Sequence, residues 1–232
     1  GATEKFKITD YINDLSKNDM GEVHSCEIEE ADFYVGSYSI GDRTRAFLKV
    51  QDGCNQFCSY CAIPFARGRE RSLNHEQVIQ IAKDLCDKGH TEIVLTGIHT
   101  GRYFDGEYDL AKLMKALLEN TPDYVYYRIS SIEITEVSDE LIALMQENPR
   151  MCHHLHIPVQ SACNETLKRM NRKYTTAQFK GIVDGLREAF DDVAITTDIM
   201  VGFPDESDEE FNKTVEFVRN IKNSGNPGRA VV

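Results

Sequence analysis

Apolar residues recur along this chain with two periodicities, which predict repeated units of a short strand, a loop and an amphipathic helix. Stretches rich in β-branched and aromatic residues predict five strands, over residues 45–51, 92–96, 124–130, 153–157 and 193–200. Strands that alternate with helices pair in parallel through right-handed crossovers. The pattern therefore predicts an α/β fold with a parallel sheet, and its five units do not make a closed eight-stranded barrel.

Residues with capping chemistry mark where the intervening helices begin. The predicted N-caps are Asn74, Asp109, Ser138, Thr175 and Ser207. The first and last of these are followed three residues later by Gln or Glu, the sequence of a capping box. A further helix is expected around residues 164–170. The apolar face expected for the last helix comprises Phe211, Val215, Val218 and Ile221.

Residues 1–42 precede the first strand–helix unit. Their apolar positions predict a short helix over residues 3–15, with a face made of Phe6, Ile8, Tyr11, Ile12 and Leu15. An acidic, irregular stretch follows. We expect this segment to pack against the core, residues 43–232, rather than to carry chemistry. At the other end, residues 228–232 leave two alternatives open, a short sixth strand or a barrel that stops before it.

Composition narrows the class of protein. The chain has 232 residues, of which 41% are hydrophobic and 28% charged, as in one large globular domain. It has no run of eighteen apolar residues and no signal-peptide pattern, so no membrane association is expected. The seven cysteines, an odd number in a long chain, do not indicate a disulfide framework. We therefore expect a reducing compartment, the cytoplasm. The net charge of −12 by itself argues against nucleic-acid binding.

Three cysteines, Cys54, Cys58 and Cys61, lie within eight residues after the first predicted strand. A loop this short can place three thiolates around one metal centre but does not easily add a fourth. Electron-transfer iron–sulfur clusters use four thiolates, so three suggest a four-iron cluster with one iron open to a ligand. The alternative is a zinc site, which needs four ligands or three and a water. No further Cys or His lies close downstream to complete it, which favours the iron–sulfur cluster.

The spacing Cys-x-x-x-Cys-x-x-Cys, with Tyr60 before the last cysteine, resembles the signature of the radical S-adenosylmethionine enzymes. The flanking residues 49–54 (KVQDGC) and 63–72 (IPFARGRERS) are similar to the methylthiotransferase branch of that superfamily. Within it the chain most resembles the enzymes that methylthiolate threonylcarbamoyladenosine beside the tRNA anticodon. The resemblance extends from about residue 1 to about residue 219. It implies an open, partial (β/α) barrel of five to six units, with residues 1–42 as the remnant of an N-terminal domain.

The resemblance implies one 4Fe-4S cluster on the three cysteines and S-adenosylmethionine bound at its open iron. The cofactor contacts that it implies lie at or after the ends of predicted strands, where catalytic groups of parallel barrels gather. They are Tyr60, Thr96, Gly97, Ser131, Glu133, Gln160 and Val201. Ser131 and Glu133 could equally be a strand end and a solvated charge. We interpret His153, His154 and His156 as structural, because strand alternation does not place all three on one side.

A basic group, Arg67, Arg69 and Arg71, follows the cysteines and is a candidate for holding a substrate phosphate or carboxylate, although it could instead pair with Glu70 and Glu76. Asp205 stands where relatives commonly have glycine, and Asp tolerates a positive φ better than most residues.

The function that the resemblance implies is methylthiolation of tRNA, with tRNA and an electron donor such as flavodoxin or ferredoxin as partners. Full-length relatives carry a second 4Fe-4S cluster in an N-terminal domain and a C-terminal RNA-binding TRAM domain, both of which we expect to be absent here. We therefore expect this chain to cleave S-adenosylmethionine but not to complete the transfer. Alternatives are modification of isopentenyladenosine in tRNA or of a ribosomal protein, and a metal-stabilised binding module without catalysis.

Overall fold

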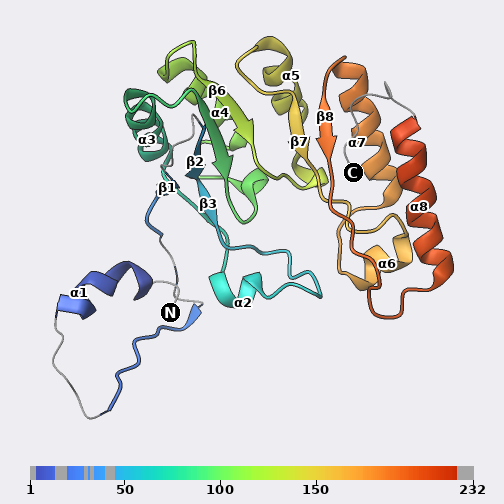
Figure 1. Cartoon of the computed structure of the whole chain (residues 1–232), viewed down its shortest axis with the longest axis horizontal. Helices are drawn as coiled ribbons and strands as arrows, with labels where there is room; N and C mark the ends of the chain where they lie inside the picture. Colours follow the sequence, from blue (N-terminus) through green and yellow to red (C-terminus); the bar gives the residue numbers. More distant parts are fainter. Residues whose placement is uncertain (1–3, 14–19, 29–30, 32–33, 40–44, 224–232) are drawn as a thin grey trace.

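Five parallel strands follow one another in sequence order across the computed structural model, which describes residues 4–13, 20–28, 31, 34–39 and 45–223 (Figure 1). They are β2 (Arg45–Lys49), β5 (Glu92–Thr96), β6 (Tyr126–Ile129), β7 (His154–His156) and β8 (Ala194–Thr196). The pairs β2–β5, β5–β6 and β7–β8 form parallel ladders. Between β6 and β7 the sheet continues through a single bridge, Tyr127 to Met151, and a hydrogen bond from Ile132 N to His156 O at 3.0 Å. The predicted open parallel barrel is confirmed.

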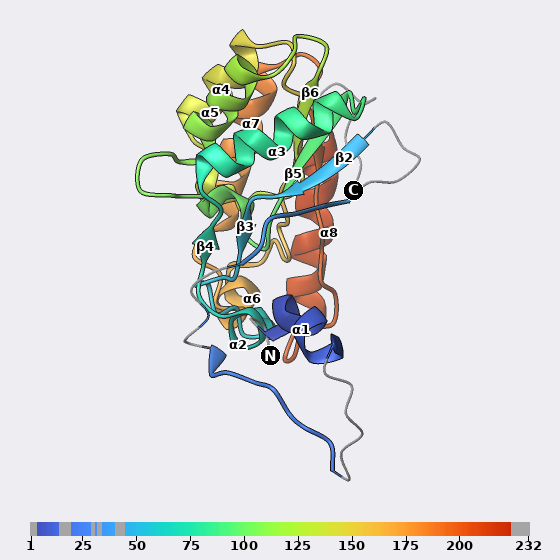
Figure 2. The same cartoon turned by 90° about the vertical axis from the view of Figure 1, so that its left-hand side faces the viewer.

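Helices connect successive strands and cover one side of the sheet. They are α3 (His75–Asp87), α4 (Leu110–Asn120), α5 (Asp139–Glu147), α7 (Thr176–Ala189) and α8 (Asp208–Asn223). Figure 2 shows α3, α4 and α5 together on this side. Their apolar faces meet the buried strand residues in one core, which includes Leu48, Leu95, Leu113 and Leu186. None of the helices in the described part of the chain has the length and apolar character needed to cross a bilayer.

Short elements occupy the loops and the N-terminal segment. They are η1 (Glu4–Lys7), α1 (Ile8–Asn13), α2 (Ile63–Arg67), η3 (Thr100–Arg102), η4 (Ile134–Glu136) and α6 (Asn164–Arg169). The helix predicted near the N-terminus is present, and Phe6 packs against the core. Ile8 and Ile12, however, are 56% and 51% exposed, so the predicted apolar face is only partly used. Leu15 and residues 228–232 lie outside the described residues.

Two antiparallel additions were not predicted. Strand β1 (Ser37–Ser39) pairs with β2 at the edge of the sheet. Strands β3 (Gln51–Asp52) and β4 (Arg71–Ser72) pair with each other, with Asp52 opposite Arg71. This hairpin ties together the two ends of the segment that contains the three cysteines.

Capping residues begin the helices as predicted. Asp109 accepts a hydrogen bond from Lys112 N at 2.8 Å, and Asn74 accepts one from Glu76 N at 3.0 Å. The box at Ser207 is reciprocal, because Ser207 N donates to Glu210 Oε2 at 3.0 Å and Glu210 N donates to Ser207 Oγ at 3.3 Å.

The buried face of α8 agrees only in part with the prediction, because Val215, Val218 and Ile221 are half-buried but Phe211 is exposed. Phe211 is 37% exposed, whereas Thr214 is 4% exposed. The Thr214 hydroxyl accepts a hydrogen bond from Ala162 N at 3.1 Å and lies 3.3 Å from Ser161 Oγ. A polar residue faces inward here because it satisfies the backbone of the loop that follows β7.

Candidate functional site

The loops that follow the strands meet at one end of the barrel, the end at which α2 and α6 are both found (Figures 1 and 2). The loop that we call the cysteine loop, residues 53–62, leads from β3 into α2. Tyr60 in this loop meets Phe203 from the loop after β8, with ring centroids 6.3 Å apart in an edge-to-face arrangement. The first and last strand–helix units therefore contribute to the same mouth.

The stem of the cysteine loop is fixed by backbone geometry and a buried ion pair. Gly53 has φ +74, and a Cβ placed on it would lie 2.0 Å from Arg69 O. Only glycine fits at this position without displacing the backbone opposite it. Beside it, the fully buried Asp52 binds Arg71 Nη2 at 2.7 Å and Lys49 Nζ at 2.8 Å. The stem thus holds Cys54, the next residue, in a defined place.

Cys54 faces hydrogen-bond donors. Its Sγ accepts from Gln56 N at 3.4 Å and lies 3.7 Å from His99 Nδ1. His99 is buried, its Nε2 lies 2.7 Å from Glu136 Oε2, and its backbone N donates to Gln51 Oε1 at 2.7 Å. Burial acts to lower the pKa of His99, but Cys54 and Glu136 outweigh it and raise that pKa to about 9. The charged imidazole is therefore favoured beside the Cys54 sulfur.

Cys58 faces a cation. Arg172 Nη1 donates to Cys58 Sγ at 3.3 Å, and Arg172 Nη2 forms an ion pair with Glu133 Oε2. The side chain of Arg172 is 5% exposed. This contact joins three segments that are far apart in the sequence at the predicted metal ligand.

The donor set fits an iron–sulfur cluster better than a single metal ion. Cys54, Cys58 and Cys61 are each partly buried. Among the described residues, the group of three ligand atoms found within 4.8 Å of one another is Cys163, Glu165 and Glu210, not these thiols. Around one zinc ion, sulfurs at about 2.3 Å from the metal would be mutually closer than that. Thiols spread over a wider span suit a cluster in which each binds a different iron.

The cofactor residues expected from the sequence lie at the strand ends or in the loops of this mouth. Ser131 and Glu133 follow β6, and Gln160 follows β7. Val201 follows β8 and is 63% exposed, and Tyr60 is 37% exposed. Thr96 is the last residue of β5.

Gly97 has a structural reason of its own to lack a side chain. A Cβ on Gly97 would lie 3.0 Å from Gln51 Cβ and 3.0 Å from Thr100 Oγ1. Gln51 in turn donates to Gly53 O at 2.8 Å, so this contact reaches the stem of the cysteine loop. The glycine therefore serves the packing of the loop stem, whether or not a cofactor approaches it.

Several residues with a left-handed backbone conformation lie at the same mouth. Among the described residues, the non-glycine residues with positive φ are Phe57, Gln160, Asn171 and Asp205. Such conformations cost free energy and tend to persist at functional sites, where the surrounding structure holds them. Asp205, whose residue type tolerates a positive φ better than most, has φ +62.

The three arginines that follow the cysteines have different environments. Arg71 is committed to Asp52, and its Nη1 donates to Arg67 O at 2.8 Å and Arg69 O at 3.0 Å. This arrangement favours a structural role for Arg71 over contact with substrate. Arg69 is exposed, and its guanidinium lies 5.1 Å from the Phe57 ring centroid. Arg67 is partly buried.

Two of the three histidines at β7 have local partners. His153 Nδ1 lies 2.5 Å from Asp192 Oδ1, and His156 Nδ1 lies 2.8 Å from Thr196 Oγ1. These contacts accord with a structural role for His153 and His156, whereas the buried Nδ1 of His154 has no hydrogen-bond partner among the described residues.

Sequence reasoning missed two informative residues of the site, Arg172 and His99. Arg172 lies in a turn with no periodic signal, and His99 follows Thr96 and Gly97 with no local pattern that indicates a role for its imidazole. Both become visible only when distant loops are brought together.

An open parallel α/β barrel that carries three cysteines on its first loop is typical of enzymes that bind an iron–sulfur cluster at the mouth of the barrel. Residues 48–218 match the family model of the radical SAM superfamily, and the chain belongs to that superfamily. The structure is similar to the radical S-adenosylmethionine methyltransferase TsrM from Kitasatospora setae, with a TM-score of 0.64 and 15% identity, covering 76% of this chain and 34% of that one.

Curated relatives are more similar in sequence. The threonylcarbamoyladenosine tRNA methylthiotransferase MtaB of Bacillus subtilis is 47% identical over 183 residues, 78% of this chain and 41% of its own. The MtaB of Thermotoga maritima is 42% identical over 224 residues, 96% of this chain and 51% of its own. A tRNA-2-methylthio-N(6)-dimethylallyladenosine synthase of Thermoanaerobacter is 40% identical over 181 residues, 77% of this chain and 38% of its own. The chain spans about half the length, or somewhat less, of these relatives.

Proposed function

We propose that Cys54, Cys58 and Cys61 hold one 4Fe-4S cluster and that S-adenosylmethionine binds at its open iron. The observation that carries this proposal is the placement of a three-cysteine loop, faced by hydrogen-bond donors, at the C-terminal mouth of the barrel. When bound, these cofactors supply one-electron radical chemistry, and the chain supplies position, electrostatics and exclusion of water.

Residues from several loops would contact different parts of S-adenosylmethionine. Tyr60 and Val201, from the two loops joined by the contact between Tyr60 and Phe203, would pack against the adenine. Thr96 and Gly97 would offer backbone atoms to the methionine part. Polar contacts to the ribose or the methionine part would come from Ser131, Glu133 and Gln160.

The substrate that we propose is a tRNA carrying threonylcarbamoyladenosine, onto which a methylthio group is transferred. The names of the two MtaB relatives support this choice. The dimethylallyladenosine synthase, at 40% identity, makes that adenosine the second candidate. The partners would be tRNA and an electron-donor protein of the flavodoxin or ferredoxin kind, in the cytoplasm.

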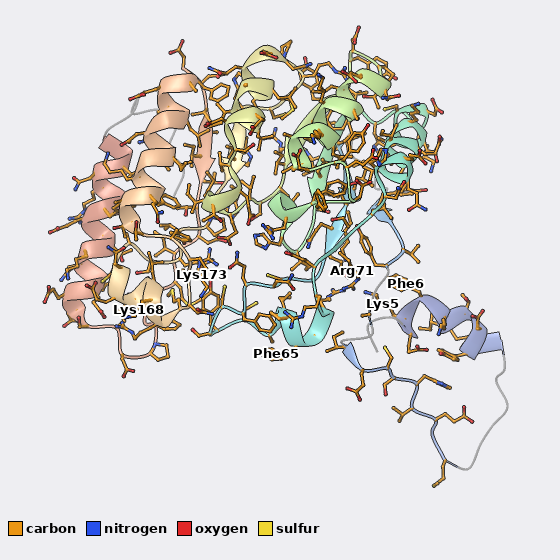
Figure 3. The ribbon with its side chains drawn as sticks, turned by 180° about the vertical axis from the view of Figure 1, so that it is seen from behind. Lys5, Phe6, Phe65, Arg71, Lys168 and Lys173 are labelled. Atoms are coloured by element: carbon orange, nitrogen blue, oxygen red, sulfur yellow. The ribbon has the colours of Figure 1, made fainter. Side chains whose placement is uncertain are left out.

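Basic side chains at the mouth make an RNA substrate compatible with the acidic chain. Lys168 and Lys173 border a groove of about 390 Å³ that Asn164, Asn171 and Arg172 also line. Figure 3 shows both lysines toward the same end of the molecule as Phe65 of α2. Cations placed here would meet a phosphate backbone beside the proposed cluster.

Anaerobic reconstitution of the 232-residue chain with iron and sulfide tests this function. We expect a broad visible absorbance, a spin signal from the reduced protein that changes when S-adenosylmethionine is added, and methionine with 5′-deoxyadenosine as products under dithionite. Stoichiometric zinc without such a signal would favour a binding module and overturn the proposal. Binding to anticodon stem-loops that carry each of the two modified adenosines separates the substrate candidates.

A further inference from the structure

The turn of residues 169–172, which begins at the last residue of α6, is docked on the cysteine loop. Ser59 N donates to Met170 O at 3.1 Å, and Ser59 Oγ donates to Arg169 O at 2.9 Å. Asn171, held at φ +58, donates from Nδ2 to Phe57 O at 2.8 Å. These bonds engage the cysteine loop on both sides of Cys58, so the turn fixes where that thiol lies.

Arg172 ends this turn and reaches the thiol itself. Its Nη1 donates to Cys58 Sγ at 3.3 Å, while its Nη2 pairs with Glu133 Oε2. The guanidinium also lies 5.1 Å from the Tyr174 ring centroid. With a side chain that is 5% exposed, the charge is poorly screened by water. A buried arginine this close to a thiolate exerts a strong local field.

We propose that Arg172 sets the reduction potential of the cluster, with Glu133 as the opposing charge. The inference rests on the proposed function, because it requires the cluster on Cys58. One-electron reduction of the cluster adds negative charge, and potentials of such clusters depend on net charge and on hydrogen bonds to the sulfurs. An N–H donor and a positive charge at Cys58 stabilise the reduced form and raise the potential. The Glu133 carboxylate acts in the opposite direction.

Opposite signs in two variants distinguish this role from a merely structural one. Arg172→Met removes the charge and the donor, so the midpoint potential becomes more negative. Glu133→Gln removes the opposing charge and leaves the guanidinium, so the potential becomes more positive. Arg172→Lys keeps the positive charge but not the paired N–H donors of the guanidinium. Its midpoint potential is therefore expected to lie between those of the wild type and Arg172→Met. If Arg172 only braced the loop, the two main variants would not shift the potential in opposite directions.

The test is a spectroelectrochemical titration of the reconstituted 232-residue chain with dithionite as reductant, without S-adenosylmethionine. We expect each main variant to change the equilibrium constant for one-electron reduction at least tenfold, which is about 59 mV. Arg169→Met is the matched control, because that guanidinium lies in the same turn but pairs with Glu210 at 2.7 Å. We expect less than a twofold change there.

Iron content and far-ultraviolet circular dichroism show whether each variant folds and holds the cluster. If Arg172→Met loses the cluster, Glu133→Gln decides the question by the sign of its shift. An unchanged or lowered potential in Glu133→Gln overturns the inference while leaving the proposed function intact. A wild-type chain that binds no cluster overturns both.

Discussion

Asp52 and Arg71 form a buried ion pair, with Arg71 Nη2 2.7 Å from Asp52 Oδ2, across the hairpin that closes the cysteine loop. The side chains are 0% and 9% exposed. Between these residues the chain leaves β3, presents the three cysteines, forms α2 and returns in β4. The pair therefore fixes the loop at its base.

Arg71→Met breaks this pair and leaves the Asp52 carboxylate buried with less compensation. Removing one partner of a buried pair typically costs about 3–5 kcal/mol, so we expect a loss of that order in the free energy of unfolding measured in urea. Arg102→Met is the control, because Arg102 pairs with Glu70 at 3.2 Å but is 52% exposed. That change is expected to cost about 0–1 kcal/mol. Equal losses in the two variants would contradict the role given to Asp52 and Arg71.

Gly53→Ala tests whether the stem must approach the opposite backbone closely. The added Cβ would collide with Arg69 O, and φ is already +74. We expect iron incorporation to fall several-fold and stability to decrease. Gly89→Ala is matched for backbone conformation, since Gly89 has φ +86 but a methyl group placed there would meet no atom within 4 Å. Such positive-φ strain alone costs about 1–3 kcal/mol, and iron binding by this control should be unchanged.

Replacement of single cysteines tests the assignment of ligands. Cys54→Ala, Cys58→Ala and Cys61→Ala should each abolish the visible absorbance of the reconstituted protein, because a three-thiolate site has no spare ligand. Cys152→Ala is the control, since Cys152 lies beside β7 away from the cysteine loop. Loss of the cluster in that variant, or its retention in any of the other three, would contradict the assignment.

Much of the fold follows from local patterns, whereas the site depends on contacts between distant loops. Strand β5 has the predicted bounds, and α4 begins after Asp109 as expected, because apolar periodicity and capping are local properties. The predicted fifth strand, residues 193–200, is regular only over Ala194–Thr196. Its remaining backbone turns to bridge Gln160 through Ile199, which no local signal specifies.

Local sequence patterns also do not specify the ion pairs of the site. Arg172 and Glu133 are 39 residues apart, and Asp52 and Arg71 are 19 apart. Nothing in the residues around Arg172 indicates that its partner is a carboxylate after β6 or a thiol after β3. The sequence predicts which loops share the mouth of the barrel, and the tertiary structure decides which side chains meet there.

Glu92 makes the stability of the fold depend on pH in the acidic range. It accepts from Arg128 Nε at 2.7 Å and lies 3.0 Å from Arg45 Nη2. Burial acts to raise the pKa of Glu92, but the two arginines outweigh it and hold the pKa below the ordinary value of 4.5. The stability that this lowered pKa contributes is therefore fully present above pH 4.5 and is lost as the pH falls through the folded value. Urea unfolding midpoints between about pH 3 and 6 should fall less steeply in Glu92→Gln than in the wild type, and identical slopes would contradict this account.

The lysines beside the cysteine loop should carry part of the affinity for RNA. Lys168 and Lys173 are both exposed at the groove next to Arg172, so charge reversal there places carboxylates against the phosphate backbone. We expect Lys168→Glu with Lys173→Glu to weaken binding of an anticodon stem-loop at least tenfold. The slope of log affinity against log salt should also become shallower, by about one for each phosphate that the double variant no longer neutralises. The control, Lys83→Glu with Lys115→Glu on α3 and α4, changes net charge equally on the helical side of the barrel. If the two double variants weaken binding to the same extent, net charge and not this groove governs the interaction, because a specific contact must depend on where the cations lie.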